Sequence, residues 1–227
     1  MKTLFNLAAI LLLLIPQAYS QTSFGLRFAI NPGQNPAASY LIVNRQDPTK
    51  ECLFNVEHIM PSKLIGLMVR MENENFWLMG ELLYGQSETQ YSLIYTYRIA
   101  KEDETNLYAL KKSFIDMPVT VGAKLGLFEI FSGFIMSKDL TTENEMNRVD
   151  GYSESLPALR FGWHVGAGVA LGPVLIDVRY QQEFSNYGTG QFINGQELRL
   201  FNLPDRFSAT AAFRFWFKKS QALFRSQ

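Results

Sequence analysis

Hydrophobic and polar residues alternate with a period of two along much of the chain. The segment VLIDVRYQQEF (residues 174–184) places four large apolar side chains on one side of an extended backbone and four polar side chains, three of them charged, on the other. Because successive side chains of a β-strand point to opposite faces, this pattern predicts a strand with one apolar and one polar face. Similar patterns predict seven further strands, at residues 23–31, 63–72, 76–85, 108–124, 127–137, 158–171 and 207–218.

The connections between these strands are alternately long and short. Tight turns are predicted at residues 73–75, around Gly126 and at residues 172–173. Residues 32–62, 86–107, 139–157 and 187–206 form the long connections. Transmembrane β-barrels have short turns at the periplasmic end, long loops at the extracellular end and an even number of strands. The sequence therefore predicts an all-β fold, an eight-stranded antiparallel transmembrane β-barrel with both termini in the periplasm.

The two ends of the chain are predicted to lie outside this barrel. Residues 1–20, MKTLFNLAAILLLLIPQAYS, combine the positive charge of Lys2, an apolar run, a break at Pro16 and small residues before the expected cleavage point. This is the layout of a secretory signal peptide. We predict a signal peptide at residues 1–20, an outer-membrane β-barrel domain at residues 21–218 and a short periplasmic C-terminal tail at residues 219–227.

Composition narrows the classes of function. The 21 basic and 21 acidic residues balance, so no nucleic acid partner is expected. Cys52 is the only cysteine, which excludes an intramolecular disulfide and a zinc cluster built on thiolates. No histidine is expected on a strand at the predicted outer rim, so we predict no catalysis, and no cofactor or metal. The Gly-x-Gly at residues 166–168 falls inside a strand, where small residues make room for large interior side chains.

The polar faces of the predicted strands carry many charged residues. If the apolar faces meet lipid, these charges lie inside a barrel that is only wide enough for side chains to fill. Since one unpaired buried charge costs several kcal/mol, we expect them to pair with one another. His164 on the same face is expected to be a satisfied interior histidine, with a proton-switched group as the alternative. The predicted interior network consists of Arg27, Arg70, Glu72, Glu81, Lys112, Asp116, Lys124, Glu129, Arg160, His164, Asp177, Arg179, Glu183 and Arg214.

Three segments resemble a known family by their order and spacing. They are FWLMGELLYGQ (residues 76–86), FIDMPVTVGAKLGLFEIFSGF (residues 114–134) and FGWHVGAGVALGPVLIDVRYQQEFSN (residues 161–186). Their Glu-Leu-hydrophobic-Tyr strand end, acidic-apolar-Pro segment and Asp-x-Arg-Tyr strand are similar to those of PorT-like outer-membrane β-barrel proteins of Bacteroidota-type bacteria. The resemblance implies an eight-strand outer-membrane barrel, and one branch of the family takes part in type IX protein secretion. The chain departs from the family in the segment KKSQALFRSQ, which follows the last strand where relatives usually end at an aromatic residue.

These observations predict a non-enzymatic protein of the cell outer membrane, an envelope or secretion accessory that functions through its long extracellular loops. Its expected partners are outer-membrane lipid and other envelope or secretion proteins. A narrow small-solute pore and a soluble periplasmic lipid-binding barrel, with apolar faces inward, are the alternatives. Aromatic residues towards the strand ends favour the membrane hypothesis, because aromatic girdles mark both interfaces of a barrel. They are Tyr84, Tyr180, Phe184, Phe215 and Phe217.

Overall fold

The chain forms an almost entirely β structure. The computed structural model describes residues 21–34, 38–43, 50–97, 102–149, 152–154, 159–184, 191–193, 196–197 and 206–216. The predicted signal peptide, the C-terminal tail and Phe217 lie outside these residues. Within the described ranges the only helix is a short 3-10 helix, η1 (Glu145–Arg148). In that part of the chain, no helix is both long and apolar enough to cross a bilayer.

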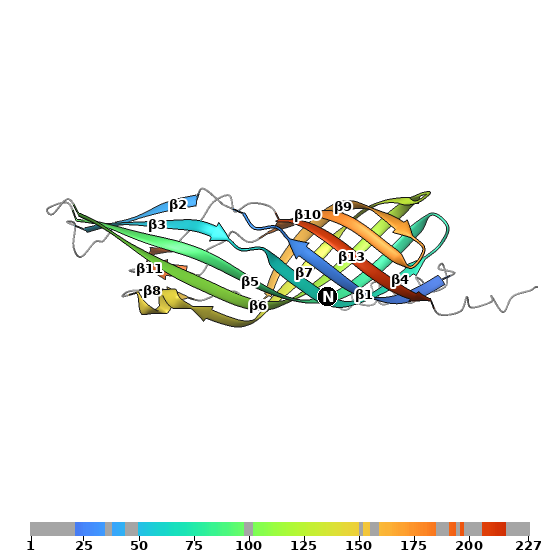
Figure 1. The fold of residues 1–227 in the computed structure, drawn as a ribbon, viewed down its shortest axis with the longest axis horizontal. Helices are drawn as coiled ribbons and strands as arrows, with labels where there is room; N and C mark the ends of the chain where they lie inside the picture. Colours follow the sequence, from blue (N-terminus) through green and yellow to red (C-terminus); the bar gives the residue numbers. More distant parts are fainter. Residues whose placement is uncertain are drawn as a thin grey trace, which may run out of the picture.

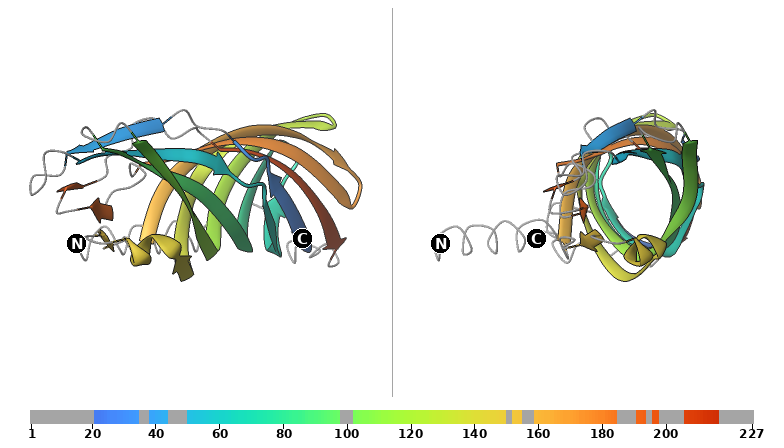
Figure 2. Two further views of the ribbon diagram at one scale, coloured as in Figure 1. Left: turned by 60° about the vertical axis from the view of Figure 1, so that its left-hand side comes forward. Right: turned by 90° about the vertical axis from the view of Figure 1, so that its left-hand side faces the viewer.

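Eight strands pair into a closed antiparallel ring, seen from the side in Figure 1 and end-on in Figure 2. Each strand is paired with the next ring strand along the chain, and the last pairs with the first. The predicted all-β class with eight antiparallel strands is thereby confirmed. The ring consists of β1 (Gln21–Asn31), β4 (Ser62–Glu72), β5 (Phe76–Tyr97), β6 (Glu102–Leu125), β7 (Phe128–Asn144), β9 (Leu159–Leu171), β10 (Val174–Glu183) and β13 (Arg206–Trp216).

The strands of the ring are tilted. From Gln21, the residue pairs run around the ring through Trp77 and Arg179 and return to β1 just beyond Ile30. The ring therefore closes with a stagger of about ten residues, which for eight strands requires a tilt of roughly 40° from the ring axis. Two of its tight turns contain glycine with positive φ, 71° at Gly126 and 59° at Gly172, as the left-handed conformation of such turns requires.

The structure corrects the predicted long connections. Strand β5 continues to Tyr97 and β6 already begins at Glu102, so most of residues 86–107 is a paired hairpin. Residues 32–62 contain two further strands, β2 (Ala38–Val43) and β3 (Lys50–Ile59), and β3 pairs with the extended part of β5. These strands project from one end of the ring, whereas the tight turns lie at the other end (Figure 1).

Two more predicted connections also contain regular structure. Strand β7 continues to Asn144 and leads into η1. The short strands β8 (Tyr152–Glu154), β11 (Gln191–Ile193) and β12 (Gln196–Glu197) form a separate small sheet. We refer to β2, β3, the part of β5 after residue 86 and the part of β6 before residue 113 as the projecting sheet.

The apolar side chains are buried in separate cores. The projecting sheet has its own cluster, to which η1 contributes Met146 and the residue after η1 contributes Val149. The cluster consists of Phe54, Val56, Tyr91, Leu93, Leu110, Met146 and Val149. The ring encloses two clusters: Met68, Trp77, Met79, Phe131, Leu175 and Ala212 in one, and Ala29, Leu64, Leu83 and Phe114 in the other. The projecting part is therefore packed around a core of its own.

Candidate functional site

The outer face of the ring is an apolar belt. Alternate residues of all eight strands point outward, and many of their large side chains are about half exposed; Val178 is 60% exposed and Leu67 is 59% exposed. With a rise of about 3.3 Å per residue and the tilt given above, the stretches from Phe76 to Tyr84 and from Ile115 to Leu125 span roughly 20 to 25 Å along the ring axis. This height matches the apolar band of membrane barrels, which is about 25 Å.

Aromatic side chains lie at both borders of this belt. Phe76, Phe128 and Phe215 are exposed near the tight-turn end. At the opposite border, the Tyr180 ring contacts the Trp163 ring at 5.7 Å and the Phe207 ring at 5.3 Å between centroids. Of the five aromatic residues predicted to mark the interfaces, Tyr84, Phe184 and Phe215 are exposed, Tyr180 is half-buried in this cluster, and Phe217 is outside the described chain.

The inner face carries charged side chains in three layers along the ring axis. The middle layer pairs Arg27 and Arg179 with Glu81 and Asp177, and all four side chains are at most 9% exposed. Arg179 Nη2 is 2.6 Å from Glu81 Oε1, and Arg179 Nε is 3.0 Å from Asp177 Oδ1. Arg27 donates to Asp177 and, over 2.6 Å, to the Thr210 hydroxyl. The two positive and two negative charges cancel within the layer.

A second layer lies at the tight-turn end. Arg70 is 2.8 Å from Glu72 and 2.6 Å from Glu129. Arg214 and Lys124 approach the same Glu72 carboxylate at 3.1 and 3.2 Å. One carboxylate therefore binds three cations, of which Arg70 is on its own strand, and the other two tie β4 to β6 and β13 across the interior.

A third layer lies where the projecting sheet leaves the ring. Arg160 is 2.7 Å from Asp139 and 3.0 Å from Glu183. Lys112 Nζ is 3.5 Å from Asp139, and Arg206 pairs with Glu183. The exposed fractions of these side chains reach 28%, so this layer is wetter than the middle one.

Aromatic rings fill the space between the charge layers. The Arg70 guanidinium lies over the Trp77 ring at 4.4 Å, and the Arg179 guanidinium lies 5.4 Å from the Phe131 centroid. Gly122 and Gly166 leave room for these rings, because an added Cβ would come within 2.3 Å of Trp77 and 2.5 Å of Phe131. Glycine in these strands thus serves close packing of large interior side chains, as expected for the Gly-x-Gly segment.

All fourteen predicted network residues lie on the inner face, and most of them meet in the three layers. Two do not join an ion pair. Asp116 is 2% exposed and faces Ser137 across the β6–β7 pair, without a cation within ion-pair distance among the described residues. His164 is fully buried and its Nε2 is 2.9 Å from the Thr120 hydroxyl.

Sequence reasoning missed two network members. Asp139 and Arg206 fell in predicted loops, but in the structure both complete the third layer. The alternation of the sequence already indicated both residues. Asp139 lies on the same strand face as Ser137, and Arg206 lies on the same face as Ser208. Extending each strand by two residues along its polar face would have found both.

The charged side chains of the described interior are held mainly by one another. In the part of the chain that the structure describes, no group of three or more His, Cys, Asp or Glu side chains is placed to hold a metal ion. Apart from Asp116, the carboxylates of the predicted network pair with guanidinium and ammonium groups, so the chemistry that the arrangement supports is electrostatic cross-linking of strands. A comparison with models of known protein families finds no match, and a search of characterised proteins finds no similar sequence.

Proposed function

We propose that this chain is a transmembrane β-barrel of the outer membrane and a non-enzymatic envelope protein. The observation that carries the proposal is the apolar belt around the whole ring. Soluble monomers rarely expose contiguous apolar patches larger than a few hundred Å², and here large side chains of all eight strands are exposed at one level. In a bilayer these side chains meet hydrocarbon, while the paired interior charges are shielded from it.

The filled interior favours a structural role for the network over a solute pore. Trp77, Phe131 and Met68 are at most 6% exposed and lie between charge layers, so side chains occupy the space that a conduit would need. A soluble lipid-binding barrel requires the reverse orientation, with apolar side chains inside the ring and charges outside. Neither alternative has an observation in its favour.

The projecting sheet is the part that we assign to partner binding. Its core is closed by the Phe54 and Tyr91 rings, stacked 5.1 Å apart and each 1% exposed, with Leu93 fully buried beside them. Such packing makes it a preformed platform rather than a set of loops that order on binding. Together with the resemblance to PorT-like proteins, this supports a role as an accessory of protein secretion.

Two measurements test the proposal in sequence. Envelope fractionation, followed by gel electrophoresis with and without boiling, is expected to place the protein in the outer membrane with a heat-dependent mobility shift. Absence of both would overturn the barrel.

A strain lacking the protein is then complemented with the wild type, with F54A/Y91A, which removes the stacked pair, or with Leu82→Ala on the belt as a matched control. Retention of normally exported proteins with F54A/Y91A alone is the expected result; full complementation by it would refute the role of the platform.

A further inference from the structure

Polar side chains form two rows directly above the apolar belt on β4, β5, β6 and β7. Register places Lys63, Gln86, Ser113 and Thr141 side by side, and each belongs to the outward face. The row one step further out along the strands contains Glu88, Lys111 and Glu143, and Pro61, just before β4, lies next to it in the same cavity. The row below them still belongs to the belt and contains Ile65, Tyr84 and Ile115. On β4, β5 and β6 the change from apolar to polar therefore occurs within two residues, whereas on β7 the exposed Lys138 already lies beside Ile115.

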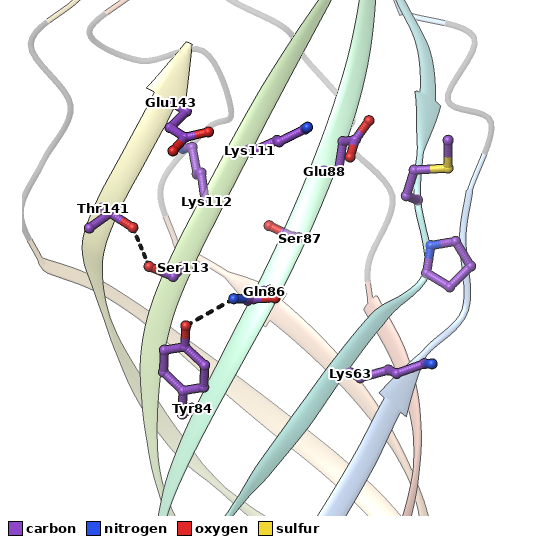
Figure 3. Close-up of a pocket in the computed structure, with 12 residues that line it drawn as sticks. Lys63, Tyr84, Gln86, Ser87, Glu88, Lys111, Lys112, Ser113, Thr141 and Glu143 are labelled. Carbon is purple, nitrogen blue, oxygen red and sulfur yellow. Dashed lines mark hydrogen bonds between the residues drawn. The ribbon is translucent and has the colours of Figure 1, made fainter.

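These rows line an open cavity of about 470 Å³ on the outside of the ring (Figure 3). Its floor is held in shape by two side-chain hydrogen bonds. Gln86 donates to the Tyr84 hydroxyl over 3.0 Å, and the Ser113 and Thr141 hydroxyls bond to each other. The β6–β7 pair also shifts register between Ser113 and Phe114, which breaks the regular sheet surface at this point. The cavity is thus a feature of paired strands and not of a loop.

The cavity presents cations without partners inside the described chain. Lys63 and Lys111 are exposed, and neither ammonium forms an ion pair with a described residue. Glu88 and Glu143 flank Lys111 on the neighbouring strands at directly paired positions. The site therefore combines two available ammonium groups with carboxylate, hydroxyl and amide groups.

The geometry points to this cavity as a binding site for the headgroup of a phosphorylated glycolipid in the surrounding membrane leaflet. The inference rests on the proposed transmembrane function, because it is the belt that sets the cavity at headgroup level. Lysines just outside the hydrocarbon attract anionic headgroups, and Lys63 and Lys111 would bind the phosphate. Sugar hydroxyls donate well to carboxylates, and Glu88 and Glu143 supply such acceptors. Acyl chains attached to the same headgroup would run down the belt past Ile65 and Tyr84.

The test uses the full chain, folded in detergent micelles, and a fluorescent monophosphorylated diacylglucosamine glycolipid as the probe. Its dephosphorylated form and inorganic phosphate provide the other two arms. We expect the phosphorylated lipid to bind at least about tenfold more tightly than the dephosphorylated one. Added salt should weaken the binding of the phosphorylated lipid. The double variant K63Q/K111Q should lose roughly tenfold in affinity, whereas Arg148→Gln, which removes an exposed cation on η1 away from the cavity, should not change it.

The outcomes separate this inference from the proposed function. If the purified chain shows no heat-dependent mobility shift, the barrel proposal and this site fall together. If the shift is present but both lipids bind equally, or R148Q loses as much affinity as K63Q/K111Q, the glycolipid site alone is wrong. Displacement of the lipid by equimolar inorganic phosphate would also overturn it, because the site would then recognise free phosphate. The same mobility shift verifies that the double variant is folded.

Discussion

Replacing Glu81 by glutamine tests the buried middle layer. In the native protein Glu81 lies 3.3 Å from Arg27 Nε and accepts from Arg179 over 2.6 and 3.1 Å. Glutamine keeps the size of the side chain but removes its negative charge. Its amide NH2 would also face a guanidinium donor. Two arginines would then remain with only the Asp177 carboxylate, which leaves one net positive charge in the middle of the ring.

The cost of this change follows from burial. The Glu81 and Arg27 side chains are both 0% exposed and that of Arg179 is 1% exposed, so water cannot screen the uncompensated charge. Breaking a buried ion pair by removing one partner typically costs about 3 to 5 kcal/mol. We expect Glu81→Gln to lower the free energy of unfolding by that amount. The neutral double variant E81Q/R179Q should be less destabilised than the sum of the two single variants, because Arg27 and Asp177 still balance.

Folding from urea into detergent micelles, followed by the heat-dependent gel shift and tryptophan fluorescence, measures these free energies. The control is Glu74→Gln, which removes the same charge from an exposed position in the β4–β5 turn. A difference of no more than about 0.5 kcal/mol between the unfolding free energies of E81Q and E74Q would be typical of surface changes. It would show that the interior is hydrated. The reasoning from a filled ring would then be refuted, and the small-solute pore would become the better hypothesis.

Two further substitutions test the packing of the interior and the belt. Gly122→Ala should lower the free energy of unfolding in the same assay by about 1 to 3 kcal/mol, because its Cβ would collide with Trp77. The control is Gly80→Ala, which should change this free energy little, because nothing lies within 4 Å of the added Cβ. Val178→Arg should destabilise the protein folded into lipid vesicles by roughly 2 to 4 kcal/mol, whereas Thr22→Arg, at the exposed start of β1, should cost about 1 kcal/mol or less. Equal costs for the two arginine variants would show that the belt does not contact hydrocarbon.

The ring could be predicted from sequence because its strands follow one rule within the height of the belt. Outward residues are mostly apolar and the charged residues point inward, as in β10, where Ile176 and Val178 are exposed while Asp177 and Arg179 are buried. The same alternation assigns each network residue to the inward face of its strand. Which charges pair could not be read from the sequence, because the pairs join strands that are distant in the chain, such as Arg27 with Asp177.

The projecting sheet was missed because that rule ends at the border of the belt. Beyond Tyr84, the segment QSETQYSLIYTY (residues 86–97) has polar residues on both faces, so its strand period has little contrast. Outside a bilayer an outward side chain gains nothing by being apolar, and the pattern that reveals a membrane strand disappears. Strand propensity was still visible in the Tyr, Ile and Thr content of the segment.

The buried charges of the ring also determine how the projecting sheet is oriented. Strand β5 runs without interruption from the middle layer into the second core, and Glu81, Tyr91 and Leu93 are buried on the same face. A one-residue slip of β5 would turn Glu81 towards the belt and leave Arg27 and Arg179 without it. The same slip would turn Tyr91 away from Phe54 and open the core of the platform. Because one continuous strand makes both sets of contacts, the cost of unpairing the buried charges opposes any rotation of the platform relative to the ring.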